Sequence, residues 1–399
     1  MPDYDIITVG GGIGGSALAT AMAEHGHRVL VIERETSFKD RVRGEWMAPW
    51  GAAEAKKLGV YDAIIASGGQ DSPNIAARAG PAALPLRNLV TESVLGMAAL
   101  AMYHPAMQEG LIAAAETASA EVRRGVKVKA VRRGKEPEVD IESDSGTETL
   151  TARLVVGADG RNSMVRKWAG FESREEQPGN ILSGVLLENL ELPAETSVIV
   201  FNPFVGQVAL LFPQGDGRTR AYFGCREASG VRLQGDGDLP RFIELSIQTG
   251  APAELYDGAK QAGPVASFSG YDSWVEHPYK DGIALVGDAA QTSDQTWGQG
   301  LSITMRDACE LRDALLATDD WDAAGHKYAE AANACFEQIR LVEDWMTLIM
   351  MDQSDEANAT RSKVLPRLAM DPGVLPDTHF SGPELAPADE AARARLFGE

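Results

Sequence analysis

The start of the chain alternates between apolar runs and small residues, the pattern of a strand, a turn, a helix and a second strand. Residues 5–9 and 28–33 are short and largely apolar, as buried strands require. Residues 16–25 between them are rich in alanine and favour a helix. The unit spans about 30 residues, the length expected of a βαβ unit in a dinucleotide-binding fold.

Helical and extended segments continue to alternate up to residue 156. The pattern predicts helices over residues 52–58 and 106–121, extended segments over 97–103, 126–132, 138–143, 148–151 and 154–156, and a turn at 144–146. Residues 73–96 hold proline, glycine and asparagine without a clear period.

Around Pro178 the pattern changes to closely spaced extended segments. It predicts strands over residues 181–190, 197–201, 208–212 and 218–223, a hairpin-type turn at 215–217 and a helix over 239–249. This block predicts a mostly antiparallel sheet, inserted as a separate lobe. The remaining pattern predicts a buried strand over 283–286, helices over 300–317 and 321–351, and an irregular tail from residue 371 that ends in a short helix.

The turn after the first strand is a dinucleotide fingerprint. Residues 10–15 fit G-x-G-x-x-G, with Gly10, Gly12 and Gly15 at the key places. These glycines allow a tight turn, close approach of a pyrophosphate, and close packing of helix on strand. Glu33 ends the second strand, where a carboxylate accepts hydrogen bonds from a ribose 2′-hydroxyl. The motif alone does not distinguish FAD from NAD.

Two later segments hold further glycine and aspartate motifs. Residues 154–163 read Leu-Val-Val-Gly-Ala-Asp-Gly-Arg-Asn-Ser, and residues 283–290 read Ile-Ala-Leu-Val-Gly-Asp-Ala-Ala. Residues 297–302, Trp-Gly-Gln-Gly-Leu-Ser, open a long helix. In this order and at these separations, the three motif regions resemble the p-hydroxybenzoate hydroxylase family, the group A flavoprotein hydroxylases. The resemblance covers residues 4–175 and 275–350, and the middle lobe fits in outline.

The resemblance implies that the cofactor is FAD. In the family, the counterpart of Asp288 contacts the ribityl chain, and that of Asp159 lies near FAD and the path of the reductant. The positive end of the helix that follows Gly298 stabilises negative charge on reduced flavin. The residues expected to bind FAD are Gly10, Gly12, Ile13, Gly14, Gly15, Glu33, Arg34, Arg43, Gln108, Val131, Asp159, Gly287, Asp288, Gly298, Gln299, Gly300, Leu301 and Ser302.

Three of these positions depend on the family pattern alone. Arg43 stands where the family places an arginine near the FAD phosphates, and Val131 where a backbone group meets the adenine. Gln108 matches the end of an Arg-x-x-Leu-Gln segment, but His104 replaces the usual arginine. Either His104 supplies that phosphate contact or it is a packed histidine.

The expected floor of the pocket also departs from the family. Residues 291–297 read Gln-Thr-Ser-Asp-Gln-Thr-Trp, where the family has a histidine followed by prolines. Thr296 and Trp297 are therefore candidates to face the substrate, or they pack beneath the flavin. Phe201 and Phe212 of the inserted lobe are further pocket candidates. No catalytic side chain is assigned, because the flavin performs the chemistry.

The pattern and the resemblance together predict an α/β fold, a Rossmann-like FAD-binding domain with an inserted, mostly antiparallel α+β lobe and C-terminal helices. Residues 1–72, 97–177 and 275–370 are assigned to the discontinuous FAD-binding domain. Residues 73–96 and 178–274 are assigned to a substrate-binding lobe, and residues 371–399 to a C-terminal tail.

The resemblance implies an FAD-dependent monooxygenase that uses NAD(P)H and O2 to insert one oxygen atom into a small aromatic or polycyclic substrate. No second G-x-G-x-x-G follows a predicted strand. NAD(P)H is therefore expected to bind transiently, or a separate flavin reductase supplies the electrons.

Three alternatives stay open. The first is a flavin-dependent reductase of the geranylgeranyl-reductase type, which adds hydrogens and no oxygen. The second is a flavin-dependent halogenase, since residues 44–49 fit G-E-x-x-x-P, although the W-x-W-x-I-P motif is absent. The third is a non-catalytic flavoprotein that acts as a redox-sensitive binding module.

Charge and cysteine content exclude several other classes. The 399 residues include 37 Lys and Arg against 58 Asp and Glu, a net charge of −21, which repels nucleic acid and anionic membranes. Cys225, Cys309 and Cys335 form no C-x-x-C pair, and no metal site is expected. Few cysteines, no signal-peptide pattern and no long apolar stretch favour a cytoplasmic protein. The oligomeric state stays undetermined.

Overall fold

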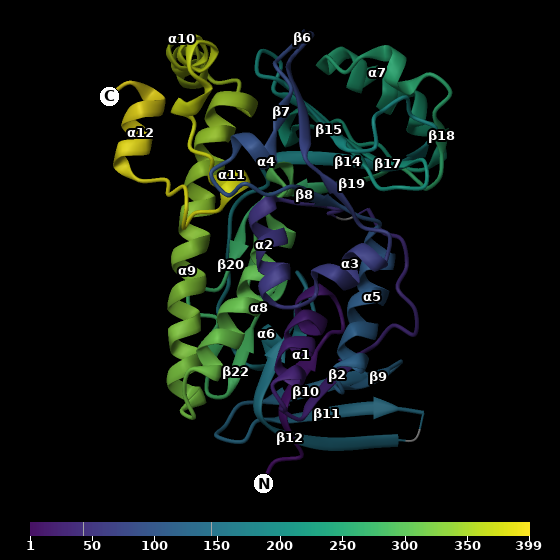
Figure 1. Ribbon diagram of the computed structural model, residues 1–399, viewed down its shortest axis with the longest axis vertical. Coiled ribbons are helices and arrows are strands. Elements are labelled where there is room, and N and C mark those ends of the chain that lie inside the picture. Colours follow the sequence, from purple (N-terminus) through teal and green to yellow (C-terminus); the bar gives the residue numbers. More distant parts are fainter. Residues whose placement is uncertain (43, 145) are drawn as a thin grey trace.

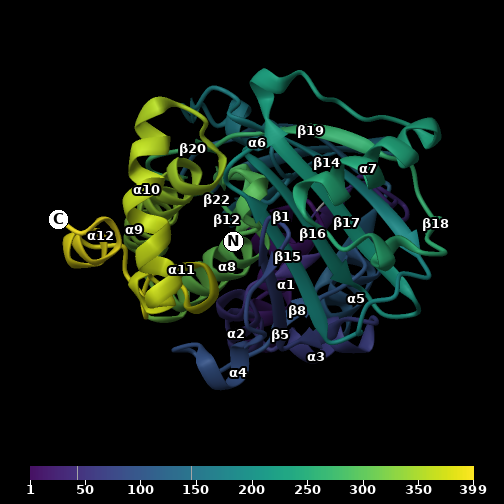
Figure 2. The ribbon, with the colours of Figure 1, turned by 90° about the horizontal axis from the view of Figure 1, so that it is seen from above.

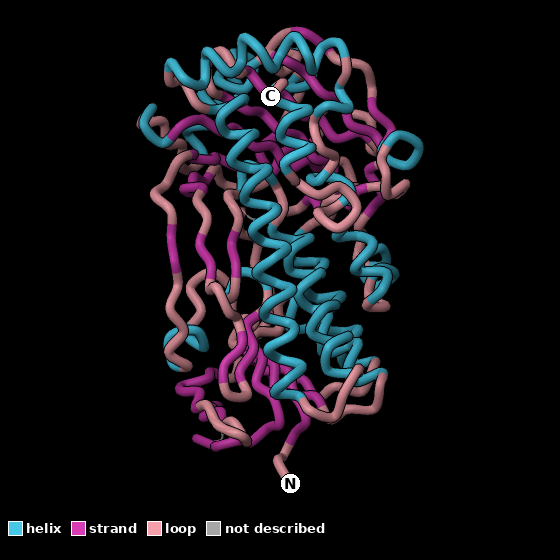
Figure 3. Tube along the Cα trace, turned by 90° about the vertical axis from the view of Figure 1, so that its left-hand side faces the viewer, coloured by secondary structure: helices cyan, strands magenta, loops and turns pink. Residues whose placement is uncertain are grey.

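The computed structural model describes residues 1–42, 44–144 and 146–399. It is elongated, with an 8-stranded sheet near the N-terminus and a 9-stranded sheet toward the other end (Figure 1). The long helix α9 (Trp321–Met346) runs along one side between the two sheets (Figure 3). This arrangement confirms the predicted α/β fold with a mostly antiparallel second sheet and C-terminal helices.

The first sheet is centred on β1, which lies between β2 and β12 and is parallel to both. β9 extends the parallel order beside β2, and β22 lies parallel to β12. Its strands are β1 (Tyr4–Val9), β2 (Val29–Glu33), β9 (Glu121–Arg124), β10 (Lys127–Arg132), β11 (Glu138–Ser143), β12 (Gly146–Gly157), β21 (Tyr279–Lys280) and β22 (Ile283–Leu285). The carboxyl ends of the parallel strands meet at one edge, where open α/β sheets bind ligands.

Helix α1 (Ile13–Glu24) is the centre of the first domain. Every residue from Ile13 to Ala23 is buried, because the helix packs against β1, α5 (His104–Thr117) and α8 (Gly300–Leu316). Its run of glycine, alanine and serine side chains is small enough to let these elements approach closely. The alanine-rich composition therefore reflects burial as well as helix propensity.

The second sheet is antiparallel except where β5 pairs with β15 in parallel. Its strands are β5 (Asn74–Ala79), β6 (Ala82–Ala83), β7 (Arg87–Asn88), β14 (Asn180–Glu188), β15 (Thr196–Asn202), β16 (Gln207–Pro213), β17 (Arg218–Arg226), β18 (Lys260–Gln261) and β19 (Ala266–Gly270). Helix α7 (Leu239–Thr249) packs on one face, with Phe242 and Leu245 in the core that they share. The opposite face directs Leu210 and Phe212 toward the C-terminal helices.

Short elements connect the two parts. They are β3 (Trp46–Met47), β4 (Gln70–Ser72), β8 (Ala99–Ala101), β13 (Arg174–Glu175), β20 (Ser273–Trp274), β23 (Gln291–Thr292), α2 (Pro49–Lys57), α3 (Tyr61–Ala66), α4 (Leu89–Glu92) and α6 (Met164–Trp168). After α9 follow a π-helical turn (Thr347–Met351), α10 (Asp355–Met370), α11 (Thr378–Ser381) and α12 (Glu390–Phe397). Seen from above, helices α10, α11 and α12 lie along one side of the second sheet (Figure 2).

Several predicted boundaries are corrected by the structure. Residues 148–151 and 154–156 belong to one continuous strand, β12. Its first half pairs with β11, and its second half pairs with β1. The helix predicted to reach residue 121 ends at Thr117, and Glu121 begins β9. Residues 74–79, expected to be irregular, form strand β5 because β15 lies beside them. Helix α10 was not predicted at all.

None of the described helices is long and apolar enough to cross a membrane. Among the same residues, no cluster of three His, Cys, Asp or Glu side chains is arranged to hold a metal ion.

Candidate active site

A cavity of about 2110 Å³ lies between the ligand-binding edge of the first sheet, the second sheet and the C-terminal helices. Protein sites for one small molecule usually measure about 300–1,000 Å³. This cavity therefore has room for a dinucleotide and a second ligand together. One end is formed by the glycine turn after β1, and the other by aromatic and aliphatic side chains.

Of the three key glycines in the turn, only Gly12 has space beside its Cα for a further atom. A Cβ added to Gly10 would lie 2.4 Å from the carbonyl oxygen of Ala158, and one added to Gly15 would lie 2.0 Å from that of Gly10. A Cβ on Gly12 would meet nothing closer than Gln108 Nε2, at 3.6 Å. Gly10 and Gly15 are thus required by packing, while Gly12 leaves space for a ligand.

Glu33 closes the turn from the neighbouring strand. Its carboxylate is buried and accepts hydrogen bonds from the backbone N–H groups of Gly11 and Glu35, both at 2.8 Å. Glu33 and Arg34 both line the cavity, and the Arg34 side chain is largely exposed. The acidic residue is therefore held rigidly at the place where a ribose is expected.

The predicted phosphate and adenine contacts are only partly brought together. Gln108 and Ile13 line the cavity beside Gly12 and Gly14. Val131 is buried in the core and does not line the cavity; the same strand reaches it through Lys127, Val128 and Lys129. Arg43 lies outside the described residues.

His104 occupies the position of the usual arginine at the start of α5. Its ring lies on the cavity wall, and Nδ1 is 2.8 Å from the carbonyl oxygen of Gly44. The backbone N–H of His104 donates to Glu45 at 3.2 Å. The imidazole is therefore a fixed part of the wall.

The loop after β12 is organised by Asp159. Its carboxylate accepts hydrogen bonds from Ser163 Oγ and from the backbone N–H groups of Met164 and Val165, at 2.5, 2.7 and 3.2 Å. Asp159 therefore holds the first turn of α6 while lining the cavity. The buried Arg166 donates to the carbonyl oxygen of Ala289 at 3.0 Å, which ties this loop to the loop after β22.

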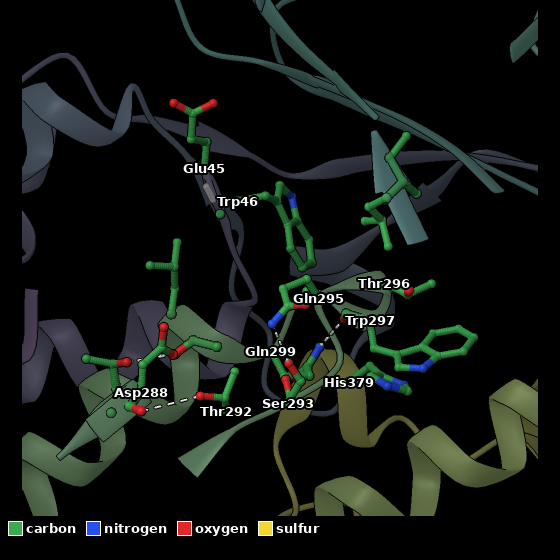
Figure 4. A pocket seen from close by; sticks show the side chains of 18 of the residues that line it. Glu45, Trp46, Asp288, Thr292, Ser293, Gln295, Thr296, Trp297, Gln299 and His379 are labelled. Atoms are coloured by element: carbon green, nitrogen blue, oxygen red, sulfur yellow. Dashed lines mark hydrogen bonds between the residues drawn. The ribbon is translucent and has the colours of Figure 1, made fainter. Parts of the chain in front are cut away.

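The loop after β22 presents Gly287 and Asp288 to the cavity. Gly287 has a φ of +57°, and its N–H donates to Asp307 Oδ2 at 2.8 Å. Burial raises the pKa of Asp307 to about 7. Asp288 lies beside Thr292, whose hydroxyl donates to the Asp288 carbonyl oxygen at 3.3 Å (Figure 4). The strand end thus places Asp288 on the cavity wall.

Helix α8 begins at the same side of the cavity. Gly298, Gln299, Gly300 and Leu301 line it, and the Gln299 side chain is fixed by Trp50, whose Nε1 donates to Oε1 at 3.0 Å. Ser302 does not line the cavity, because it packs against Gly51 of α2. Four of the five residues predicted at this helix start therefore face the site.

Two aromatic pairs wall the far end of the cavity. Phe201 stacks on Trp297 with ring centroids 5.6 Å apart, and Phe212 stacks on Trp46 at the same distance. His379 from the C-terminal tail lies against Trp297 at 6.1 Å (Figure 4). All five side chains line the cavity, as does Thr296. All four pocket candidates predicted from the sequence therefore lie on this wall.

The pair Glu45 and Arg220 was not identified from the sequence. Glu45 lines the cavity with a fully buried carboxylate, which accepts two hydrogen bonds from the Arg220 guanidinium and one from Gln214 Nε2 at 2.5 Å. The two residues are far apart in the sequence, and the G-E-x-x-x-P pattern around Glu45 was the one available signal.

The polar atoms of the wall fit a bound flavin. Trp46 Nε1, Ser293 Oγ, Gln295 Oε1, Thr296 Oγ1 and Trp297 Nε1 are buried and have no hydrogen-bond partner among the described residues. Buried polar groups are normally paired, so such a cluster on a cavity wall indicates a polar ligand. The isoalloxazine ring of FAD has hydrogen-bonding groups along its edge, and Gly12 leaves space for its pyrophosphate.

This fold and cavity define the class of FAD-dependent flavoproteins. The chain matches the FAD binding domain family over residues 3–330, and it belongs to that family. The family match confirms the predicted cofactor, FAD, and the predicted class, an FAD-dependent oxidoreductase of the flavoprotein hydroxylase kind.

Individual relatives include both monooxygenases and a reductase. The chain is 30% identical over 342 residues to rifampicin monooxygenase of Streptomyces venezuelae. The alignment covers 81% of this chain and 66% of that protein. It is 28% identical over 337 residues to digeranylgeranylglycerophospholipid reductase 1 of Methanopyrus kandleri, with 81% and 84% covered. The crystal structure of p-nitrophenol 4-monooxygenase from Pseudomonas putida has a TM-score of 0.76 over 99% of this chain and 97% of that one. At 19% identity, that likeness concerns the fold alone.

Proposed function

We propose that the chain is an FAD-dependent monooxygenase that uses NAD(P)H and O2 to insert one oxygen atom into an aromatic or polycyclic organic substrate. One observation supports this most directly: the dinucleotide end and an apolar chamber walled by aromatic rings form one continuous cavity. The residues between the two ends would hold the flavin ring next to the substrate.

The FAD-binding residues follow from the cavity wall. Gly12 and the N-terminus of α1 would hold the pyrophosphate, because the N–H groups and dipole of the helix attract phosphate. Glu33 holds the ribose, and Val128 replaces Val131 as the proposed adenine contact because it lines the cavity. Asp288 would hold the ribityl chain. The N-terminus of α8 would bind the flavin ring, where its positive end would stabilise negative charge on the reduced cofactor.

The inserted lobe selects the substrate in this proposal. Residues 73–96 and 178–274 supply Ile75, Phe201, Leu210 and Phe212 to the chamber, and the tail from residue 371 adds His379. Stacked and edge-on rings suit a flat aromatic ligand. The same apolar wall excludes water from the reaction.

Bound FAD supplies the redox chemistry: it takes electrons from NAD(P)H and reacts with O2. The protein positions the ring, orients the substrate and keeps water out. NAD(P)H, the reductant typical of this family, binds transiently, since no second glycine motif is present; a separate flavin reductase is the alternative source of electrons.

The decisive experiment is mass spectrometry of product formed under labelled dioxygen. The purified holoenzyme is screened with phenols and polycyclic aromatics for stimulated NAD(P)H oxidation, and products are analysed for one labelled oxygen atom. A substrate that is turned over without oxygen, and gains only hydrogens, would contradict the proposal.

That contrary result would favour a flavin-dependent reductase. The reductase function is supported by the match to the Methanopyrus kandleri reductase, which covers 84% of that protein. An apolar chamber also suits an unsaturated hydrocarbon chain. Anaerobic turnover of an isoprenoid substrate with reduced FAD would separate this function from the monooxygenase.

A further inference from the structure

Glu343 of α9 is a buried acid without a hydrogen-bond partner. Its side chain is 3% exposed, and neither carboxyl oxygen is paired within the described residues. Such a group carries a free-energy cost, because it has lost water without gaining a partner.

One side of Glu343 faces the cavity wall. Ser293, on the segment after β23, lines the cavity and has an unpaired, buried hydroxyl. The Asp272 carboxylate accepts hydrogen bonds both from the backbone of Asp294, next to Ser293, and from Arg340, one turn before Glu343, which places Ser293 and Glu343 in one region. Met346, one turn further along α9, also lines the cavity. Ser293 thus stands between the cavity and Glu343.

The other side of Glu343 leads toward the surface. Asp272 accepts a hydrogen bond from the backbone N–H of Asp294 at 2.7 Å and one from Arg340 Nε at 3.2 Å. Arg340 lies one turn before Glu343 on α9 and pairs with Glu176, whose side chain is 41% exposed. Asp272, Arg340 and Glu176 therefore connect the buried region to solvent.

The surrounding charges favour a proton on Glu343. Burial raises the pKa of Glu343 well above its usual range, and the charges of Asp272, Asp294 and Asp344 act in the same direction. Burial also raises the pKa of Asp272 to about 7. The titratable or charged groups around this region are Asp272, Asp294, Asp344, Glu176, Arg340 and Arg226.

We propose that Ser293, Glu343 and Asp272 form a proton path between the cavity and the surface, with Glu343 as the donor. The Glu343 O–H gives its proton to Ser293 Oγ while the Ser293 hydroxyl proton passes to the acceptor in the cavity. The Glu343 carboxylate then regains a proton from solvent by way of Asp272. One proton moves inward and no other atom is exchanged.

This inference rests on the proposed function of the cavity as an oxidoreductase site. Oxygen insertion and double-bond saturation both require a proton at the reacting end of a chamber that excludes water. A path through the wall supplies it without opening the chamber.

The protonation state is tested first, without turnover. Infrared difference spectra of the holoenzyme are recorded at neutral pH for wild type, Glu343→Gln and the control Glu330→Gln, which changes an exposed acid on the same helix. Asp272 and Asp307, whose pKa values are raised to about 7, also contribute protonated-carboxyl C=O intensity at this pH. We therefore expect one component of this band to be present in wild type and Glu330→Gln and missing in Glu343→Gln. A Glu343→Gln spectrum that matches wild type in this region overturns the proposal.

Proton transfer is tested second, by single-turnover flavin absorbance in H2O and D2O across the neutral pH range. Glu343→Gln should slow the proton-dependent step by about 100-fold or more, the usual contribution of a positioned acid. Ser293→Ala should slow it too while keeping the Glu343 infrared component, and Glu330→Gln should match wild type. Wild-type rates and pH profile in Glu343→Gln would refute the path. A failed oxygen-insertion assay with the infrared band intact would instead contradict the proposed function.

Discussion

The turn between β1 and α1 contains three key glycines, and each can be replaced by alanine in turn. These single substitutions distinguish glycines required for stability from the glycine required for FAD binding. At Gly15 the new Cβ would lie 2.0 Å from a backbone oxygen, and at Gly10 it would lie 2.4 Å from another, where φ is also +105°. At Gly12 the nearest atom would be 3.6 Å away and φ is −73°. We expect Gly10→Ala and Gly15→Ala to damage the fold, and Gly12→Ala to damage cofactor binding alone.

The expected magnitudes follow from these distances. Gly12→Ala should change the free energy of unfolding of the apoprotein by less than about 1 kcal/mol, the size of the unfolded-state entropy effect. Gly10→Ala and Gly15→Ala should each cost about 3 kcal/mol or more, because backbone must move to relieve the overlap. The methyl group on Gly12 enters the space of the pyrophosphate, so FAD should bind about 100-fold more weakly, a loss of about 2.7 kcal/mol.

Two measurements check this, urea denaturation of the apoproteins and titration of FAD by flavin fluorescence. Gly237→Ala is the matched control, because no atom lies within 4 Å of its new Cβ. It should leave both quantities unchanged. The reasoning would be refuted if Gly12→Ala bound FAD with wild-type affinity, or if it lost as much stability as Gly15→Ala.

Three further predictions concern the chamber. Trp297→Ala removes a ring that helps to close it, so product formed per NAD(P)H consumed should fall and hydrogen peroxide should rise; unchanged coupling would contradict this. Phe201→Ala or Phe212→Ala should weaken substrate binding more than FAD binding, measured by separate titrations. Burial lowers the pKa of His379 from 6.5 to about 4. The unfolded state therefore binds more protons between these values. Stability should decrease as the pH is lowered from about 6.5 to about 4, by at most about 3 kcal/mol, and by less where cavity water solvates the ring. His379→Gln should flatten that dependence in denaturation curves, and an unchanged slope would exclude His379 as its source.

Local pattern was sufficient for the segments whose boundaries are set by their own residues. The helix predicted over residues 239–249 matches α7 at both ends, because Pro240 suits a first turn and Gly250 ends the helix with a positive φ. The strand, glycine turn and helix at the start of the chain were predicted for the same reason. Helix α1 nevertheless begins at Ile13 and not at residue 16, so the buried Gly14 and Gly15 belong to its first turn.

Segments whose conformation depends on distant partners were not predicted. Strand β5 exists because β15 lies beside it, although residues 74–79 have no strand pattern of their own. The same limit applies to the site. Glu45 and Arg220 are separated by 175 positions, and no sequence pattern predicts that the two side chains pair. Val131 was assigned by family pattern, and only the orientation of β10 shows that Val128, and not Val131, lines the cavity.

The tail from residue 371 lines the cavity, although its sequence has no periodic pattern that predicts this. It was expected to be an irregular wrap, yet it is tied to both ends of the molecule. Arg87 pairs with Asp377 at 2.6 Å from the second sheet, and Arg306 of α8 pairs with Glu384 at 2.8 Å. These contacts hold His379 against Trp297 and give the chamber its last wall. Because no periodic pattern marks such a segment, only the arrangement in space identifies it as part of the site.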